Sequence, residues 1–552
     1  MVADIVRDST FGQIVNYLSK GRYFPYADQR PDYVVPSRYL KNDSSPKFPR
    51  TTSESPTVVT SGAPTLVNDP GICTEIADAN KEAFDIHPEH RLDAEKALAA
   101  VPEPVKEGEA PYPWLVEFEE NDPDRPLNWT SRKRIFIAAL IAILTFGVCL
   151  MSEFKISQVG AISGLTLFVA AYGISPMILS PIQELPKIGR NPVYIIGLAL
   201  FVIFQIPEIL AKNMATVLIF RFFSGFVGGP ALATGGASMG DIFPPEHLAV
   251  AIGAWAIGAV SAPTLAPVVG SFAAEAKNWR WPFLELLWLS GATFIVLFFL
   301  LPETLESTIL VRRAERLRKL TGNELLKAPA EVAAVEGETL AQNLKVTTQR
   351  AFRLAIEPSL AVCHIYIGLV YSIFYLWFEA LPICFGEEYG FSLGISGLPF
   401  LAFVVSASVT FTFYVLYQRW HVQPRLAKNP DTPPEIRLEL GVMAGPLVPV
   451  SLLIFGWTAG RTHWMGPVVG AGLYLPPSYP MYAASILAGN DLFRSVMASL
   501  FPLFGDKYFR ALGLGPGCTL LAGLSALLVP VLYAVMKMGP RLRARSRFAD
   551  AA

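Results

Sequence analysis

Apolar segments of roughly 20 residues recur from residue 132 onward, each long enough to cross a hydrocarbon core of about 30 Å as a helix. A charged segment separates six of them from six more, which is the layout of two packed helical bundles. The predicted spans are 135–151, 159–181, 193–211, 215–236, 248–272 and 282–302, then 358–381, 394–417, 440–458, 464–475, 482–504 and 513–536.

The remaining segments are polar. Residues 1–131 are rich in Pro, Ser, Thr, Asp and Glu, and the stretch 41–70 has too little apolar surface to offset chain entropy. The expected organisation is a largely disordered head at 1–131, a first bundle at 132–302, a middle loop at 303–350, a second bundle at 351–537 and a basic tail at 538–552.

Basic residues predict the orientation, because cytosolic loops of membrane proteins carry an excess of Lys and Arg. Such residues precede the first span at 132–134, crowd the middle loop at 312–319 and close the chain at 537–547, whereas the loop near 383–393 has none. We therefore expect the head, the middle loop and the tail to lie in the cytosol, which requires an even number of spans.

Composition excludes several classes of protein. The chain is 52% hydrophobic and only 16% charged, against about 25% charged in soluble domains. The net charge of −1 gives no attraction to nucleic acid. The five cysteines form no CxxC pair and the six histidines show no ligand spacing, so neither disulfides nor a metal site is expected. With no nucleophile–base spacing and no phosphate loop, we expect no enzyme and no cofactor.

The loop between the second and third spans carries an acid, a glycine and a base, at Glu184, Gly189 and Arg190. A short connection between helices needs a flexible residue, and charges near helix ends can pair with each other and with the helix dipoles. This pattern predicts a conformational latch. The alternative is an ordinary turn with positive charge on the inner side.

Arg221 lies inside the fourth span, where a full charge costs at least about 2.5 kcal/mol and needs a partner or a purpose. It could serve proton coupling or lock helices together, with Gly225 one turn further on. The alternative is that the side chain extends to the outer surface, since it lies about two turns from that end.

The fifth span combines small residues with two prolines, Pro263 and Pro267, at a spacing of four. Glycines such as Gly258 and Gly270 let helices approach closely, and prolines bend a helix by removing backbone hydrogen bonds. The pattern predicts a bent helix with a role in the conformational change. Ordinary small-residue packing is the alternative.

Aromatic side chains in the seventh span, Tyr371, Phe374, Tyr375 and Phe378, recur at a spacing that places them on one helix face. Aromatic walls bind flat apolar molecules without fixed hydrogen bonds, which suits a substrate pocket of broad specificity. A lipid-facing or interfacial belt would give the same pattern.

Acidic residues within the spans are candidates for carrying protons or binding cationic substrates. They are Glu285, Glu379 and Asp491, and Asn490 is a further polar candidate. Each acid could instead form an ion pair, as Asp491 could with Arg494 one turn on.

Together these motifs resemble the major facilitator superfamily, and in particular the fungal drug:proton antiporters with twelve spans. Glu184 stands where many members have Asp, and alanines precede the prolines of the fifth span where the antiporter signature has glycines. The head resembles the subgroup associated with benomyl, methotrexate and azole resistance. The segments that carry the resemblance are 180–191, 253–270, 233–241, 279–281, 301–304, 312–323 and 489–495, with 7–9, 18–20 and 35–39 in the head.

The resemblance implies an all-α membrane protein with the major facilitator fold, in which two six-helix bundles enclose a central cavity. It implies export of structurally varied drugs or toxic compounds in exchange for protons, at the plasma membrane. The expected partners are the lipid bilayer, small amphipathic or aromatic drug-like substrates and protons, with no nucleic acid, and a monomer is expected. The candidates are Glu184, Gly189, Arg190, Arg221, Gly225, Gly258, Pro263, Pro267 and Gly270 for conformational or proton coupling, and Glu285, Tyr371, Phe374, Tyr375, Phe378, Glu379, Asn490, Asp491 and Arg494 for substrate binding.

Two spans depart from the family pattern. The first runs almost directly into the second, and the tenth offers only residues 464–475, which would reach about 18 Å as a helix. We therefore expect a tight turn at 152–157 and a shortened or distorted tenth helix at 466–475. These departures support an alternative function, that of a non-transporting or impaired membrane protein: a sensor, a scaffold or the product of an incomplete gene model.

Overall fold

A computed structural model describes residues 2–36, 39–40, 114–149, 158–333, 358–429, 439–474 and 484–544, with a few single residues between 342 and 352. Within these ranges the chain is helical and forms no strand. The first bundle consists of α4 (Ser131–Cys149), α5 (Gln158–Ile174) with its continuation α6 (Pro176–Glu184), α7 (Arg190–Ile209), α8 (Met214–Ile242), α9 (Pro245–Ala276) and α10 (Trp281–Leu300).

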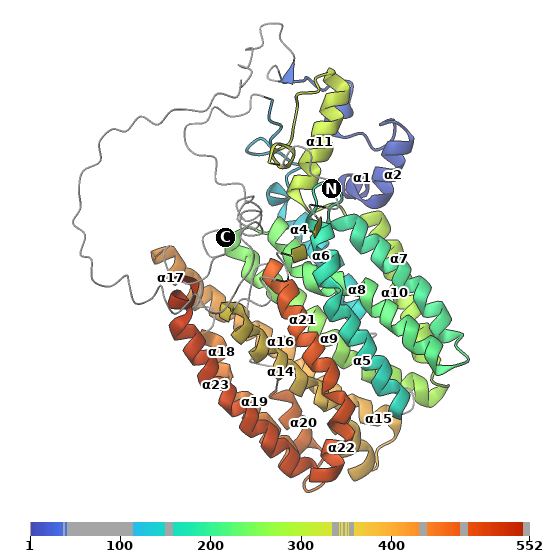
Figure 1. The fold of residues 1–552 in the computed structure, drawn as a ribbon, viewed down its shortest axis with the longest axis vertical. Coiled ribbons are helices and arrows are strands. Elements are labelled where there is room, and N and C mark those ends of the chain that lie inside the picture. Colours follow the sequence, from blue (N-terminus) through green and yellow to red (C-terminus); the bar gives the residue numbers. More distant parts are fainter. Residues whose placement is uncertain are drawn as a thin grey trace, which may run out of the picture.

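The second bundle lies beside the first with its helices running in a similar direction (Figure 1). It consists of α14 (Pro358–Pro382), α15 (Leu393–Gly397) leading into α16 (Leu401–Tyr417), α17 (Gln423–Lys428), α18 (Glu439–Ala444) leading into α19 (Leu447–Thr458), α20 (Met465–Gly472), α21 (Ala484–Leu500), α22 (Pro502–Leu512) and α23 (Leu514–Ala544). Nine helices in the described part of the chain are long and apolar enough to cross a membrane. The predicted all-α membrane fold is confirmed.

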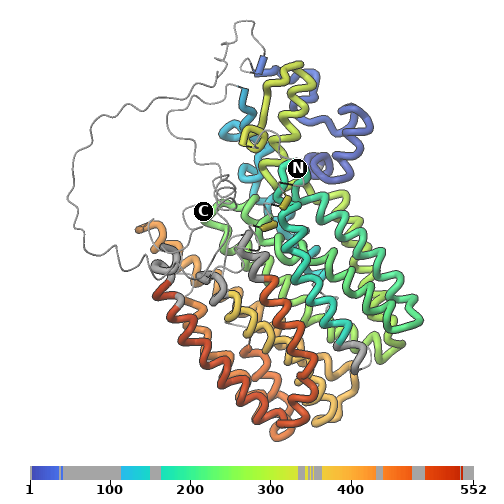
Figure 2. Tube along the Cα trace, viewed as in Figure 1, coloured from blue at the N-terminus to red at the C-terminus, as the bar shows by residue number. Residues whose placement is uncertain are grey.

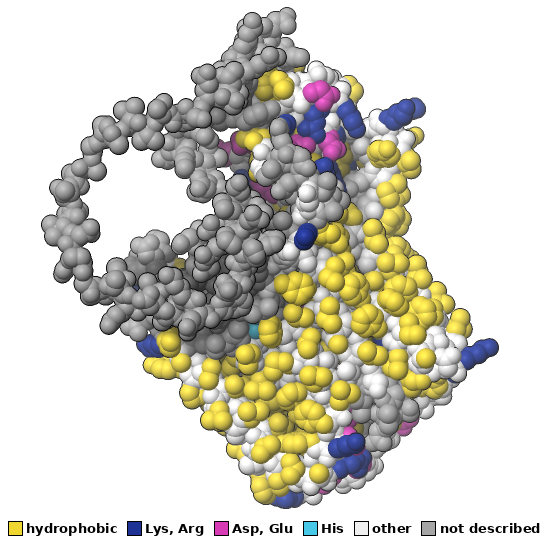
Figure 3. Space-filling model, viewed as in Figure 1, with side chains coloured by type: hydrophobic (Ala, Val, Ile, Leu, Met, Phe, Trp, Pro, Cys, Tyr) yellow, Lys and Arg dark blue, Asp and Glu magenta, His cyan; other side chains and the backbone are white. Residues whose placement is uncertain are grey.

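The surface of the bundles is apolar, as a lipid solvent requires. Ile196, Ile203, Ile295 and Leu527 are each more than half exposed. Figure 3 shows hydrophobic side chains covering the flank of the helices, with charged side chains gathered toward the ends. Helices that are apolar on every side are typical of membrane spans, because one face meets neighbouring helices and the other meets lipid chains.

The two bundles have different interiors. In the first, small residues let the helices touch: a Cβ added to Gly197 of α7 would lie 2.8 Å from the carbonyl oxygen of Val227 in α8. The second is filled by rings, and the Trp377 ring centroid lies 4.5 Å from that of Phe455 and 5.6 Å from that of Tyr474. Glycine-lined contacts give close helix approach, whereas stacked rings fill volume.

Contacts between the bundles include those of α5 with α21 and those of α9 with α15 and α16. Thr166 of α5 donates a hydrogen bond to the carbonyl of Ser499 in α21 (3.0 Å). Tyr414 of α16 donates to the carbonyl of Ala249 near one end of α9 (3.4 Å). Near the other end of α9, the Glu275 carboxylate accepts from the backbone N–H of Gly394 in α15. The bundles therefore touch at both ends of α9.

Two parts of the head, within residues 2–36 and 114–130, are folded. α1 (Val2–Asp8), α2 (Thr10–Leu18), η1 (Ala27–Gln29) and residues 114–130 pack against α10 and against α11 (Glu306–Thr321) of the middle loop. Figure 2 shows this blue segment beside the yellow-green α11. The predicted disorder of 41–70 lies outside the described residues.

Charges hold the head to α11. Arg316 Nε lies 2.9 Å from Asp28 Oδ2 across 288 residues of sequence, and Arg313 pairs with Asp122. The Val116 N–H also donates to the carbonyl of Lys327 (2.9 Å). Composition could not reveal this fold, because the short helices are held by contacts with α10 and α11 and not by a neighbour in sequence.

The tenth helix is short. α20 has 8 residues and ends at Gly472, followed by a turn at Leu473 and Tyr474, so the expected shortening is confirmed up to residue 474. Leu475 and the expected turn at 152–157 lie outside the described residues. The eleventh predicted span, 482–504, is too long, because α21 ends at Leu500 and Pro502 begins the separate helix α22.

Removing residues 2–36 is expected to lower both the thermal stability and the surface abundance of the protein. The deletion would expose the rings of Phe298 and Phe299, which Phe11 covers, and would leave Arg316 without Asp28. Fluorescence-detected size-exclusion chromatography after heating measures the first effect and surface biotinylation the second. Deleting residues 51–70 is the control, and equal losses from both deletions would contradict this role of the head.

Candidate functional site

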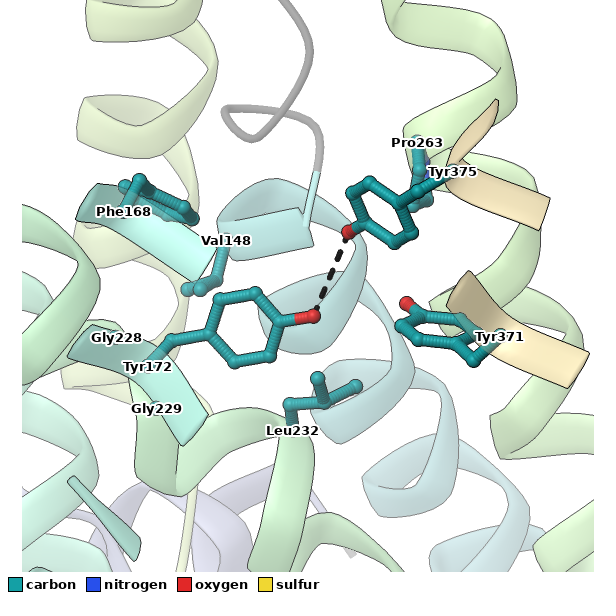
Figure 4. A pocket seen from close by; sticks show the side chains of 9 residues that line it. All are labelled: Val148, Phe168, Tyr172, Gly228, Gly229, Leu232, Pro263, Tyr371 and Tyr375. Carbon is teal, nitrogen blue, oxygen red and sulfur yellow. Dashed lines mark hydrogen bonds between the residues drawn. The ribbon is translucent and has the colours of Figure 1, made fainter. Parts of the chain in front are cut away.

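A small cavity lies between the bundles, about midway along α8 and α14 (Figure 4). The space that it encloses is about 10 Å³, enough for about one water molecule. The Tyr172 and Tyr375 hydroxyl oxygens face each other across it at 3.5 Å. The lining residues are Val148 of α4, Phe168 and Tyr172 of α5, Gly228, Gly229 and Leu232 of α8, Pro263 of α9, and Tyr371 and Tyr375 of α14.

A buried ion pair adjoins this cavity. Asp491 and Arg494 of α21 form a salt bridge, and the Arg494 guanidinium carbon lies 4.6 Å from the centroid of the Tyr371 ring. Ser495 donates to Asp491 Oδ1 (3.3 Å), whereas Asp491 Oδ2 accepts no hydrogen bond among the described residues. Asp491 is only 2% exposed. A carboxylate with an unused acceptor therefore lies next to the tyrosines.

A second cavity, which encloses about 80 Å³, lies toward the end of α9 at Ala276. Pro267 and Gly270 of α9 line it together with Phe378 of α14 and Phe400. Pro263 and Tyr375 of the first cavity are one helical turn from Pro267 and Phe378, so the same faces of α9 and α14 line both cavities.

The remaining candidates lie elsewhere. Phe374 is buried inside the second bundle, where its ring is stacked on that of Tyr474 at 6.3 Å. Glu379 contacts α22, since a Cβ on Gly505 would lie 3.0 Å from Glu379 Cγ. Glu285 is half-buried on α10 and lines neither described cavity. The side chain of Asn490 lies outside the described residues.

Arg221 is buried, which excludes the surface-reaching alternative. It is 3% exposed, and its Nε lies 3.9 Å from Glu208 Oε2. The guanidinium carbon lies 4.9 Å from the centroid of the Phe283 ring. Ser224 donates to Glu208 Oε1 (2.9 Å), and Glu208 is 0% exposed. The result is a buried ion pair between α7 and α8.

Sequence reasoning missed Glu208, although a signal for it was present. This carboxyl group lies inside the predicted span 193–211, and an ionisable residue within a span is a candidate functional residue by default. Gly225, the other candidate nearby, packs directly on the backbone of Phe168. Gly258 approaches α4, where an added Cβ would lie 3.4 Å from the carbonyl oxygen of Ala142.

The loop after α6 is held by two carboxylates, those of Asp241 and Glu303. Arg190 Nε lies 2.5 Å from Asp241 Oδ2 at the end of α8. Glu303 Oε1 accepts from the N–H of Arg190 (3.1 Å) and from those of Thr304 and Leu305 (both 3.0 Å). Burial raises the pKa of Glu303, while Arg312 and these backbone donors act to lower it. Glu184 is exposed and contributes to the field at Arg190.

Replacing Gly189 with valine is expected to destabilise this loop. Gly189 has φ +84° and ψ −175°, a conformation open essentially only to glycine, and a Cβ there would lie 2.8 Å from the Glu303 carboxyl carbon. Backbone strain of this kind costs about 1–3 kcal/mol. We expect slower interconversion between inward- and outward-open states with less effect on equilibrium drug binding. Gly291, where a Cβ would meet open space, provides the matched Gly→Val control. Equal losses of binding and transport would argue against a conformational role.

No group of three or more His, Cys, Asp or Glu side chains in the described part of the chain could hold a metal ion. The side chains around the two cavities offer ion pairing, hydrogen bonding and aromatic contact. Two buried carboxylates, Glu208 and Asp491, each lie beside an arginine, and both pairs are within the bundles.

Comparison with known proteins places the chain in a family. Residues 134–504 match the family model described as Major Facilitator Superfamily. Relatives include Transporter mfs1 of Schizosaccharomyces pombe, 36% identical over 87% of this chain and 94% of its own length. Multidrug transporter FLR2 of Candida glabrata is 37% identical over 79% of both chains. The Cycloheximide resistance protein of Candida maltosa is 32% identical over 99% of this chain and its full length. The chain belongs to the major facilitator superfamily.

Proposed function

We propose that this membrane transporter exports drugs or other toxic compounds in exchange for protons. The observation that carries the proposal is the aromatic cavity between the bundles, beside the buried Asp491–Arg494 pair. Tyrosine and phenylalanine rings would contact flat apolar molecules, and the unused acceptor on Asp491 would bind a proton or a cationic group. The names of FLR2 and the Cycloheximide resistance protein support drug substrates.

Coupling needs a titratable group that reaches each side of the membrane in turn. Asp491 is our first candidate for the proton carrier, because it adjoins the cavity and has an arginine partner that can compensate its charge. Glu208 and Arg221 serve in this proposal as a lock between α7 and α8. The Arg190–Asp241 pair would hold the loop after α6 in one of the two states.

We place the transporter in the plasma membrane as a monomer, with the head, α11 and both chain ends in the cytosol. Support for this orientation comes from the basic residues of α11, which include Arg312, Arg313, Arg316 and Arg318. The opposite end carries acidic Glu387 and Glu388 between α14 and α15.

Transport by purified protein in lipid vesicles tests this function. We expect an imposed proton gradient to drive accumulation of a fluorescent aromatic drug against its concentration gradient, and a protonophore to abolish it. Drug movement that stops at equal concentrations on both sides, with the gradient intact, would show a facilitator without proton coupling.

A second candidate is an impaired or non-transporting membrane protein, favoured by the length of α20. Eight residues rise about 12 Å, well short of a hydrocarbon core of about 30 Å. Non-helical backbone inside a membrane is tolerated only where protein or water forms hydrogen bonds with its N–H and C=O groups. Tyr474, directly after α20, is 0% exposed among the rings of α14, so the protein does cover part of this region.

This protein is therefore expected to transport drugs only weakly. A variant with an apolar helical insertion after Tyr474 that brings this helix to about 20 residues should regain efflux, because a complete helix removes the mismatch. The measurement is the initial efflux rate per surface molecule for both chains. Rates in the present chain that match those of FLR2 itself would contradict impairment.

A further inference from the structure

The helix α2 in the head has an apolar face that no described residue covers. Ile14, Tyr17 and Leu18 follow one another at helical spacing and are 47%, 81% and 74% exposed. Tyr23, a few residues beyond the helix, is 61% exposed. Exposed apolar side chains that cluster on one face mark an interaction surface, because water solvates them poorly.

The opposite side fixes the orientation of α2. Asn16 is buried, and its Nδ2 donates to the carbonyl of Phe24 (2.9 Å) and to Gln29 Oε1 (2.9 Å). Thr10 at the start of the helix donates to Asn191 Oδ1 in α7 (2.9 Å). The apolar face thus points outward because Asn16 on the opposite side, and Thr10 at the start of the helix, are held by the fold.

This face continues the lipid-facing surface of the first bundle. The Phe11 ring centroid lies 4.7 Å from that of Phe299 on α10, and Phe299 is itself 40% exposed. Ile295, one turn earlier on α10, is 58% exposed. Hydrophobic side chains run from the bundle flank toward the place where Figure 1 shows α2 (Figure 3). The surface of α2 therefore begins where the surface that meets lipid chains ends.

The residues around α2 suit the boundary between lipid chains and headgroups. Tyr17 and Tyr23 combine an apolar ring with a hydroxyl, the property that enriches tyrosine at this level of a membrane. Lys20 and Arg22 are exposed at the end of the helix, where their charges would meet lipid phosphates.

We propose that α2 lies in the membrane interface on the α11 side of the bilayer, with Ile14, Tyr17 and Leu18 inserted among the lipid chains. The head is then a membrane-docked module and not a freely solvated domain. Lipid fits this surface better than a protein partner does, because a protein would have to displace lipid from Phe299 and Ile295 to bind the whole apolar face.

Photocrosslinking in the full chain tests this proposal. The photoreactive amino acid 4-benzoylphenylalanine is introduced at position 18 in α2, at position 320 in α11, or at position 295 in α10, and the protein is reconstituted in nanodiscs of phosphatidylcholine and phosphatidylserine. Leu320 is the matched control, since it is a leucine 52% exposed on a helix that leads away from the bundle. Ile295 is the lipid-facing reference. Lipid adducts are quantified by intact mass spectrometry.

We expect the lipid adduct yield at position 18 to approach that at position 295 and to exceed that at position 320 by at least about tenfold, because interfacial helices bury their apolar face among acyl chains. Leu18→Glu should lower the yield of a crosslinker placed at position 17, whereas Leu320→Glu should not. Equal lipid yields at 18 and 320 would overturn the proposal. So would adducts at 18 with a second copy of the chain in place of lipid.

Discussion

Replacing Arg221 with alanine is expected to lower drug efflux per surface molecule by at least about tenfold, because removing one partner of a buried ion pair costs about 3–5 kcal/mol. Glu208 would remain 0% exposed without its cation, and within the described part of the chain the Ser224 hydroxyl would be its one side-chain hydrogen-bond donor. Part of this energy would appear as reduced folding, so the rate must be divided by the surface amount. Arg221→Lys should lose less efflux, since it keeps the positive charge. Some loss is still expected, because lysine lacks the planar group that lies over Phe283.

The control for this experiment is Lys212→Ala, which removes an exposed basic residue from the nearby end of α7. A double-mutant cycle then isolates the pair: Glu208→Ala with Arg221→Ala should be less harmful than the sum of the single changes. Additive losses would show that the two side chains act independently. Normal efflux by Arg221→Ala at a normal surface level would remove the arginine from the mechanism.

Replacing Asp491 with asparagine is expected to abolish accumulation driven by the proton gradient while drug binding persists. Asparagine has nearly the same shape but cannot titrate, and it leaves Arg494 buried without an anion. Both side chains are largely buried beside the cavity, so solvent cannot compensate the lost charge. The readouts are drug accumulation in vesicles with an imposed gradient and equilibrium binding of the same drug.

Asp506→Asn is a close control, because Asp506 also pairs with an arginine on its own helix, α22. The Asp506–Arg510 pair is partly exposed, with side-chain exposures of 25% and 44%, and pairs of this kind contribute little. We expect its transport to remain near that of the parent chain. Gradient-driven accumulation by Asp491→Asn at the parent rate would assign the proton to another carboxyl group.

Much of the fold could be predicted from the sequence, because each apolar segment has the length that a bilayer imposes. The long helices α7 to α10 and α14 begin within a few residues of the predicted starts. The short helices of the head could not be predicted in the same way. Their stability depends on partners such as α11, which follow hundreds of residues later, and a local pattern carries no information on such contacts.

The candidate site was likewise predictable from the sequence only in part. Spacing placed Tyr371 and Tyr375 on one face of a helix, and the structure has both in the central cavity. Phe374 lies between them in sequence but points into the second bundle. A helix face wide enough to carry four rings borders both the cavity and the interior of that bundle. Tyr172 could not be singled out, because a single tyrosine in an apolar span carries no periodicity. Its role depends on the approach of α5 to α14.

The contacts of the Glu303 carboxylate have a consequence for inhibition. Its carboxylate ties the loop before α7 to the end of α10, Arg312 of α11 lies 4.0 Å from it, and Arg312 in turn bonds Gln13 of the head. The head, α11 and the first bundle are therefore linked by a single connected set of polar contacts. A compound that binds between the head and α11 would break this set without entering the cavity between the bundles. Such a compound is expected to inhibit transport allosterically.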